Sequence, residues 1–494
     1  MPQSSVVRIR RAFPPVVLVG LVVLLVTRIG WLSDDSLITL RTALNVSNGW
    51  GPGFNVSESV QGYTHPLWFF AWLGVGWISG QWIASVILMS LVATAVTLTL
   101  VLLLPCERGI HFALLVLLAL SNSFVEYSTS GLENPLSHAV VGSLMVLLVR
   151  LREVTERSLH GLAVGVVLSL VILTRFDLVL LVAPLFIFWF IRASRSVRIA
   201  AVLGVLPLLA SWFYWSLVAY DSLLPNTFYA KRNVNLSFME LFDQGFFYLR
   251  TSLAYDRAGG LLLLVGVVLT LAFTKPLAVA SSLGIALYLT YVASNGGDFM
   301  VGRFLSVPVY FSALSIAVSL EGWSLEPLVQ SSRQNRMNSL LVRRFFGPPL
   351  LLVLSAILIS SATAFSRQQS ERFNWERPAS RGIADERPLY VQRGSGFMRY
   401  FREISTAARS TYDPRTEDSS IVEISRSANG WPKRQDSEIQ RPLKVRTTCG
   451  LLGGKSIISG PLVHWVDTCG LTDLVIRSEE HTSELQSRQY LVCR

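Results

Sequence analysis

Residues 13–35 read FPPVVLVGLVVLLVTRIGWLSDD, an apolar run that follows basic residues and ends at two adjacent carboxylates. A helix needs roughly 17–25 apolar residues to cross a bilayer. The run from Phe13 to Trp31 therefore predicts a membrane span. A cleaved signal peptide is the alternative interpretation, but no small-residue cleavage site follows the run. We favour an uncleaved first span.

The rest of the chain repeats this apolar pattern. Of its 494 residues, 51% are hydrophobic and only 15% are charged, whereas about a quarter of a soluble domain is charged. We predict a polytopic α-helical membrane protein over residues 1–365 and a C-terminal extracytoplasmic α/β domain over 366–476. The apolar runs predict about eleven transmembrane helices, at 13–32, 82–104, 110–126, 134–150, 159–175, 177–192, 199–220, 259–274, 276–293, 303–320 and 347–365. The short, Trp-rich run 67–80 predicts an interfacial helix.

The distribution of charge predicts an orientation. The net charge of +11 would suit nucleic acid in a soluble protein, but here arginines occupy short loops between apolar runs. With the N-terminus in the cytoplasm, every inward connection is basic, as the positive-inside rule requires. We therefore predict a multi-pass plasma-membrane protein with no nucleic-acid partner. The acidic and amide-rich motifs then fall outside, at 33–66, 127–134, 175–177, 221–258, 294–302 and after 366.

The outward loop 33–66 contains the first candidate catalytic residues. Like charges raise each other's pKa, so one of Asp34 and Asp35 could serve as a base near neutral pH. The alternative is a solvated cap at the start of a short helix over 35–47. The same loop ends at His65, a further candidate for binding a donor.

Other outward motifs supply further polar candidates. Glu133 follows a Ser/Thr-rich turn and could contact a sugar hydroxyl, although a plain turn before a helix explains most of this motif. Arg175 and Asp177 separate two apolar runs, where a charge costs about 2.5–3.5 kcal/mol. These two side chains must face protein or water. Arg175 is a candidate phosphate ligand, and the alternative is that the two residues pair with each other.

Two more segments carry candidate cations. Residues 225–232 include Asn226 and Lys231, and Lys231 could bind phosphate as a point charge. The alternative is an interfacial segment with snorkelling cations. Residues 294–303 include two glycines, Asp298 and Arg303. Arg303 could grip a lipid phosphate in a bidentate fashion, or it could simply anchor the helix at the interface.

Chemistry on the outer face constrains the reaction. Nucleotide sugars are absent there, so a transferase needs a sugar donor that crosses the membrane, such as a polyprenyl phosphate. A cation about 4 Å from the leaving phosphate contributes roughly 4 kcal/mol at an effective dielectric constant near 20. The sequence has no zinc-type spacing of His or Cys and no glycine-rich phosphate loop. We infer no required cofactor, and the use of a divalent metal stays open.

The motifs DDSLITLR, GFNVSESVQGYTHPLW, STSGLEN, TRFD, LLPNTFYAK, GGDFMVGR, GIADERPLY and VDTCGLTD occur in this order. Together they resemble the GT-C class of membrane glycosyltransferases. More narrowly, they resemble the terminal β-(1→2)-arabinofuranosyltransferases of mycolic-acid-bearing actinobacteria. The resemblance extends from about Trp31 to Asp473.

This resemblance implies decaprenyl-phosphoryl-arabinofuranose as the donor and an arabinan end of the cell wall as the acceptor. It also implies that Asp34 and Asp35 match the catalytic acidic pair, and that Asp298 and Arg303 match the outward GGDFM-x-GR motif. The stereochemical course stays open, because a β-linked donor and a β-linked product do not fit one direct displacement.

Three alternative functions remain open. Residues 63–66 differ from the mycobacterial-type loop, so mannose or aminoarabinose is an alternative sugar. A lipid or sugar transporter is a further alternative, but the polar residues gather at outward ends rather than at mid-membrane. An inactive structural homologue is the third.

The C-terminal tail predicts an acceptor-binding or supporting domain. We expect a helix near 394–410 and strands near 419–424, 455–458 and 462–466. Cys449 and Cys469 could form a disulfide in an oxidising compartment, or they could be free thiols. Residues 477–494 resemble a translated sequencing adapter. We interpret them as artefactual and the domain before them as truncated.

Overall fold

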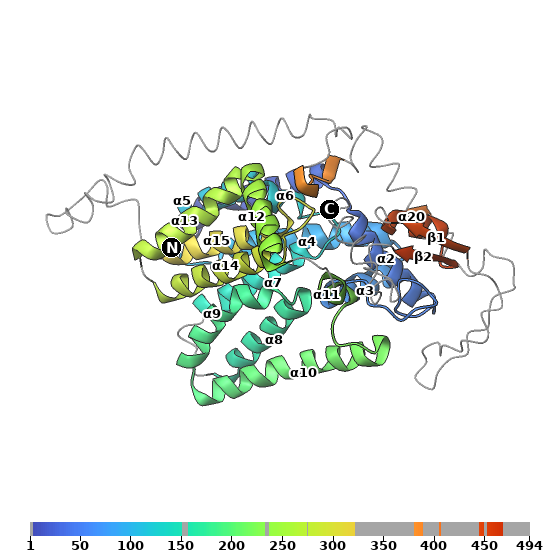
Figure 1. The fold of residues 1–494 in the computed structure, drawn as a ribbon. Coiled ribbons are helices and arrows are strands. Elements are labelled where there is room, and N and C mark those ends of the chain that lie inside the picture. Colours follow the sequence, from blue (N-terminus) through green and yellow to red (C-terminus); the bar gives the residue numbers. More distant parts are fainter. Residues whose placement is uncertain are drawn as a thin grey trace.

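The computed structural model describes residues 3–150, 157–232, 237–273, 275–321, 380–388, 405–406, 444–448 and 452–467. It is a bundle of helices with a small α/β unit at one end (Figure 1). Ten of the predicted spans fall on helices, and the eleventh, 347–365, lies outside the described residues. These helices are α1 (Gln3–Ile29), α4 (Trp82–Leu102), α5 (Arg108–Leu120), α7 (Asn134–Arg150), α8 (Ser158–Thr174), α9 (Leu178–Arg192), α10 (Arg195–Tyr220), α13 (Arg257–Phe273), α14 (Pro276–Ser294) and α15 (Ser306–Ser319).

Length and composition support a helical membrane protein. In the described part of the chain, α4, α10 and α14 are long and apolar enough to cross a membrane. Two bent pairs pass the same test if each counts as one span. They are α1 with α2 (Asp34–Ser47), bent by 86°, and α12 (Phe238–Tyr255) with α13, bent by 108°. The other apolar helices are shorter, so the count of about eleven spans stays a prediction.

Small residues bring several helices close together. A Cβ atom at Gly165 of α8 would lie 2.0 Å from the carbonyl oxygen of Ala201 on α10, and one at Gly284 of α14 would lie 1.9 Å from that of Leu181 on α9. Only glycine allows such backbone contact, a common device in membrane helix packing. At the centre, α15 packs against α7, α13 and α14, and every residue from Ser306 to Ser319 is buried.

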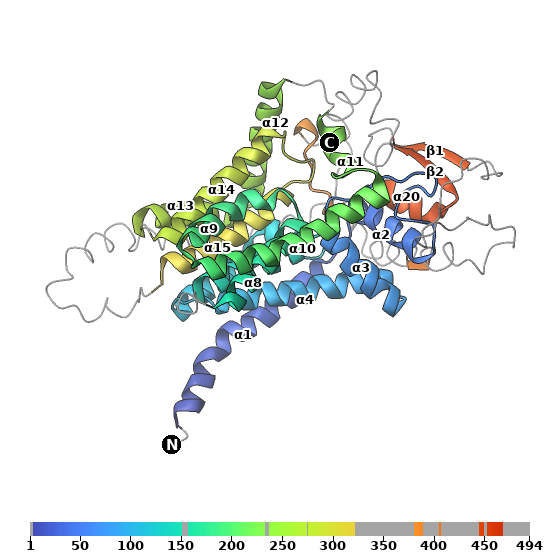
Figure 2. The ribbon, with the colours of Figure 1, turned by 90° about the horizontal axis from the view of Figure 1, so that it is seen from below.

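One end of the bundle carries the elements expected outside the membrane. The interfacial helix predicted at 67–80 coincides with α3 (Pro66–Ser79), which lies beside α2. The helix α11 (Asn226–Arg232) and the C-terminal elements lie at this same end (Figures 1 and 2). The short helix α6 (Asn122–Glu126) is separate from α5, so the predicted span 110–126 is broken near Ser121.

The C-terminal unit is a β–α–β arrangement. The strands β1 (Lys444–Thr448) and β2 (Val463–Asp467) pair in parallel, and α20 (Leu452–Ser459) connects them. The strand predicted at 462–466 coincides with β2. The strand predicted at 455–458 is wrong, because these residues belong to α20. The predicted strand at 419–424, Cys449, Cys469 and most of the predicted helix 394–410 lie outside the described residues.

Candidate functional site

The first turn of α2 sends its two carboxylates to different neighbours. Ser33 caps this helix by accepting a hydrogen bond from the backbone N–H of Ser36, and its own N–H donates to the carbonyl of Ser130. The second contact places α2 beside the turn around 127–134. Acidic residues in a first helical turn are stabilised by the helix dipole, so Asp34 and Asp35 suit this position.

Asp34 faces the C-terminal unit. Its Oδ2 atom accepts a hydrogen bond of 2.7 Å from the N–H of Gly453, and its Oδ1 atom accepts one of 2.9 Å from the N–H of Gly454. Burial raises the pKa of Asp34, and these two donors oppose the rise. Both oxygens are thus occupied at the N-terminus of α20. The contact explains why residues 455–458 are helical, since the carboxylate satisfies N–H groups that open this helix.

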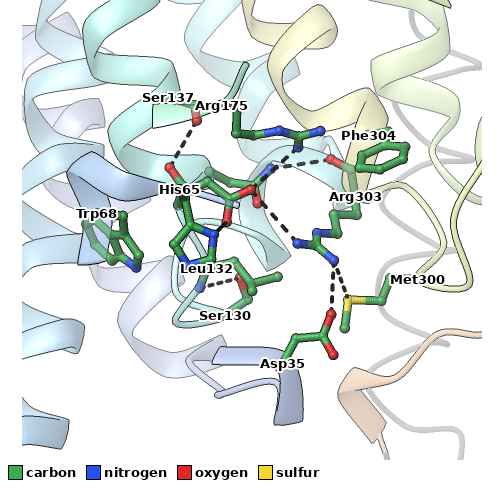
Figure 3. A network of polar contacts seen from close by, with 12 residues as sticks. Asp35, His65, Trp68, Ser130, Leu132, Ser137, Arg175, Met300, Arg303 and Phe304 are labelled. Atoms are coloured by element: carbon green, nitrogen blue, oxygen red, sulfur yellow. Dashed lines mark hydrogen bonds and ion pairs between the residues drawn. The ribbon is translucent and has the colours of Figure 1, made fainter. Parts of the chain in front are cut away.

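Asp35 faces the helix bundle and reaches solvent. Its side chain is 29% exposed, and its Oδ2 atom lies 3.2 Å from Nη1 of Arg303 (Figure 3). Burial raises the pKa of Asp35 to about 6, while the guanidinium of Arg303 opposes the rise. The expected cause was repulsion within the acidic pair. Burial is instead the largest cause, and the charges of Asp298 and Asp34 add less.

Arg303 connects Asp35 with two other acids. Its Nη1 atom lies 3.5 Å from Oδ2 of Asp298, and its Nη2 atom lies 3.9 Å from Oε1 of Glu133. The preceding Gly302 has φ = 77°, and a Cβ atom there would lie 2.6 Å from the Ser123 hydroxyl. Glycine is therefore required where the chain turns into α15. The side chain of Arg303 is only 12% exposed, so its charge is partly shielded from water.

Glu133 lies at the centre of the network and has no exposed surface. Its Oε2 atom lies 3.2 Å from Nδ1 of His65, and its Oε1 atom lies 3.6 Å from Nη1 of Arg175. Burial alone would raise the pKa of Glu133, but its charged surroundings lower it. Burial lowers the pKa of His65 to about 4, so the ring is neutral at pH 7. Besides His65, the guanidinium groups of Arg303 and Arg175 lower the pKa of Glu133.

The remaining candidates have other surroundings. Arg175 pairs with Asp177, as the alternative interpretation expected, and its guanidinium lies over the Phe304 ring at 4.7 Å. Asn226 is buried, and its backbone N–H donates to the carbonyl of Gln61. Lys231 lies on α11, but its side chain is not among the described ones. Among the described residues, no group of three or more His, Cys, Asp or Glu side chains could hold a metal ion.

Sequence reasoning missed a second contact between α2 and the C-terminal unit. Arg41 is fully buried and donates hydrogen bonds to the carbonyls of Phe54 at 2.8 Å, Ser456 at 2.6 Å and Val463 at 2.8 Å. Asn55 exchanges two further hydrogen bonds with the backbone of Trp465. The signal was present, because Asp34 and Arg41 are seven residues apart and so share one face of a helix.

Comparison with known proteins finds two arabinofuranosyltransferases that are similar to this chain. The chain is 28% identical over 325 residues to a terminal β-(1→2)-arabinofuranosyltransferase of Mycobacterium tuberculosis, covering 57% of this chain and 51% of the relative. It is 27% identical over 329 residues to the protein of the same name from Corynebacterium glutamicum, covering 58% and 48%. The chain resembles this family and spans about half the length of these relatives. No family model and no solved structure matches it.

Proposed function

We propose that this protein transfers an arabinofuranosyl residue from a polyprenyl-phosphate donor to a cell-wall arabinan acceptor on the outer face of the membrane. The pairing of Asp35 with Arg303 carries the proposal. A solvent-reaching carboxylate lies 3.2 Å from a partly buried guanidinium, at one end of an apolar helix bundle. A donor with a lipid tail and a phosphate group suits such a place.

Arg303 is the group that we assign to the donor phosphate. The guanidinium presents a fork of donors that matches phosphate oxygens, and partial burial strengthens its attraction for an anion. Its contacts with Asp298 and Glu133 are 3.5 and 3.9 Å long, which is loose for charged pairs. A bound phosphate can therefore compete for Arg303 without breaking a tight ion pair.

Asp35 is the group that we assign to the acceptor. Over the whole transfer, the acceptor hydroxyl oxygen gains a bond to the anomeric carbon, and the bond between that carbon and the phosphate oxygen breaks. The polyprenyl phosphate leaves with the electron pair, and Asp35 takes the proton of the hydroxyl. A pKa of about 6 suits this role, since a base works best when its pKa is near the working pH.

We assign a positioning role to the buried residues next to Asp35 and Arg303. Glu133 lies between Arg175 and Arg303, 3.6 Å from one guanidinium and 3.9 Å from the other, and its charge attracts both. His65 holds Glu133 from the other side, with its Nε2 atom 2.9 Å from the Thr39 hydroxyl. Glu133 was expected to contact a sugar hydroxyl. In this structure it is covered, so we assign it to positioning the arginines.

The donor sugar can be tested with membranes that contain the full chain. The assay offers polyprenyl phosphates that carry arabinofuranose, mannose or aminoarabinose and measures which sugar reaches an arabinan acceptor. We expect transfer of arabinofuranose, and a loss of about a hundredfold or more in Asp35→Asn, the scale of acid–base catalysis. Asp221→Asn is the matched control, because Asp221 is exposed at the end of α10. Full activity in Asp35→Asn would refute the assignment.

The outward orientation needs a separate test. Single cysteines at exposed positions of α12, such as Phe238→Cys and Met239→Cys, would be labelled in intact cells with a membrane-impermeant reagent. Labelling from outside is expected, because the connection 221–258 lies on the side opposite the basic loops. Labelling only after the cells are broken would reverse the orientation.

A further inference from the structure

The segment 380–388 is fixed against the candidate site at two points. Ala384 forms a parallel β-bridge with Met300, in which the Val301 N–H donates to the Ala384 carbonyl and the Ala384 N–H to the Phe299 carbonyl. Arg387 is buried, and its Nε atom donates to the carbonyl of Ile29 at 3.0 Å. The two anchors hold the residues between them, Asp385 and Glu386, beside the loop that carries Asp298 and Met300. In Figure 3 this segment passes close to Met300.

Glu386 has an unusual environment. Its Oε2 atom is buried, and no hydrogen-bond partner for it occurs in the described part of the chain. The charges that act on Glu386 are those of Asp34, Asp35, Asp298 and Arg303. The three carboxylates raise the pKa of Glu386, and the guanidinium lowers it. A fourth charge in such surroundings would be strongly unfavourable.

A buried polar group without a partner costs about 1–3 kcal/mol, and such groups in native proteins call for an explanation. Burial and the neighbouring carboxylates raise the pKa of Glu386 well above its usual range. The raised pKa favours the protonated carboxyl group, which has one O–H to donate. An anion bound at Arg303 would supply the missing acceptor.

We propose that Glu386 binds the donor phosphate together with Arg303, by donating a hydrogen bond to a phosphate oxygen. The inference rests on the proposed function and adds a ligand-contacting residue from the C-terminal part of the chain. It also assigns a role to a residue of the GIADERPLY motif at 382–390. The neutral acid supplies a donor without adding a charge next to the three existing carboxylates.

Binding of polyprenyl phosphate without a sugar tests this inference. The full-length protein in lipid nanodiscs would be titrated with the lipid phosphate, beside Glu386→Gln and Glu386→Leu. Loss of a hydrogen bond to a charged group weakens binding by about tenfold to a hundredfold. We expect that loss in Glu386→Leu, whereas Glu386→Gln keeps an N–H donor and most of the affinity. Equal affinity in all three proteins would overturn the inference.

The pH dependence separates binding from a purely structural role. Ionisation of Glu386 at high pH would place a negative charge against the phosphate, so wild-type affinity should fall as the pH rises through its pKa. Glu386→Gln should lack this alkaline fall, and an identical fall in both proteins would contradict the inference. If wild-type protein transfers sugar while Glu386→Leu binds normally, only this inference fails. If wild-type protein does not bind polyprenyl phosphate, the proposed function fails as well.

Discussion

Asp34 and Asp35 are neighbours in the sequence, but they belong to two regions with different physical character. The first region, which we call the latch, consists of Asp34, Arg41 and Asn55 with their partners in α20 and β2. The second is the ion-pair network of Asp35, His65, Glu133, Arg175, Asp298 and Arg303. One turn of α2 contributes to both regions.

The two regions differ in how completely their polar groups are paired. Every hydrogen bond of the latch named above is 2.6–3.0 Å long. In the network, the contacts of Arg303 and Glu133 are 3.2–3.9 Å long. Within the described residues, both Glu133 carboxylate oxygens, Oδ2 of Asp298 and Nε of Arg303 have no hydrogen-bond partner. The hydrogen-bonded polar groups of the latch favour stability of the fold. The polar groups of the network that lack a hydrogen-bond partner leave donors and acceptors for a ligand.

The largest expected effect is on Arg303. Arg303→Met should lower kcat by about a hundredfold to a thousandfold, the usual cost of removing one preorganised donor to a developing anion. Arg303→Lys keeps the positive charge but loses the two parallel N–H donors of the guanidinium, so its kcat should lie between those of Arg303→Met and wild type. The measurement is kcat and KM with a polyprenyl-phosphate sugar donor. A kcat for Arg303→Met within about threefold of wild type would show that the network does not hold the phosphate.

Arg41→Met is the matched control, because this arginine is also buried but belongs to the latch. We expect the rate per folded molecule to stay within a few fold of wild type. Backbone amides of residues 452–460 should exchange about tenfold to a hundredfold faster, because the loss of hydrogen bonds from a charged donor loosens α20. Unchanged exchange would contradict the role of the latch.

The pH dependence of transfer reports on the network alone. Asp35 must be deprotonated to accept a proton, and its pKa is raised to about 6. The rate should therefore fall as the pH drops through about 6, by roughly tenfold for each further unit. Rates at constant enzyme saturation between pH 4.5 and 8 would test this. Activity that stays constant down to pH 4.5 would mean that Asp35 is not the base.

A smaller effect is expected on stability. The folded protein favours protonated Asp35, because its pKa is raised from 3.8 to about 6. Stability from this group is present at low pH and is lost as the pH rises from about 4 to about 6. Asp35→Asn should remove this component and leave other pH effects unchanged. The check is the difference in thermal midpoint between the two proteins across that range, and an identical pH dependence would argue against the raised pKa.

The sequence was informative where local composition determines the structure. Apolar runs of span length placed ten helices, because burying or membrane-embedding such a run leaves few alternatives to a helix. The pairing of Asp35 with Arg303 was also within reach, since both residues lie in connections assigned to the same side. These inferences needed only local patterns and the alternation of sides along the chain.

Other features depend on partners that are far away in the sequence. Asp34 and Gly453 are 419 residues apart, so no local pattern shows that Asp34 caps α20. The same distant contact explains the error at 455–458, where Ile457 and Ile458 favoured a strand by composition. Glu386 lies in a segment without apolar periodicity, and two distant contacts place that segment at the site: the β-bridge of Ala384 with Met300 and the hydrogen bond of Arg387 to Ile29.

The division between the two carboxylates can be tested most directly by comparing Asp34→Asn with Asp35→Asn in one preparation. Sugar transfer per folded molecule and hydrogen exchange at residues 452–460 would be measured on both variants. We predict that Asp35→Asn loses about a hundredfold of its activity and keeps α20 protected. Asp34→Asn should keep its activity within about tenfold and lose that protection. The reverse pattern, or equal losses of activity in both variants, would contradict the account.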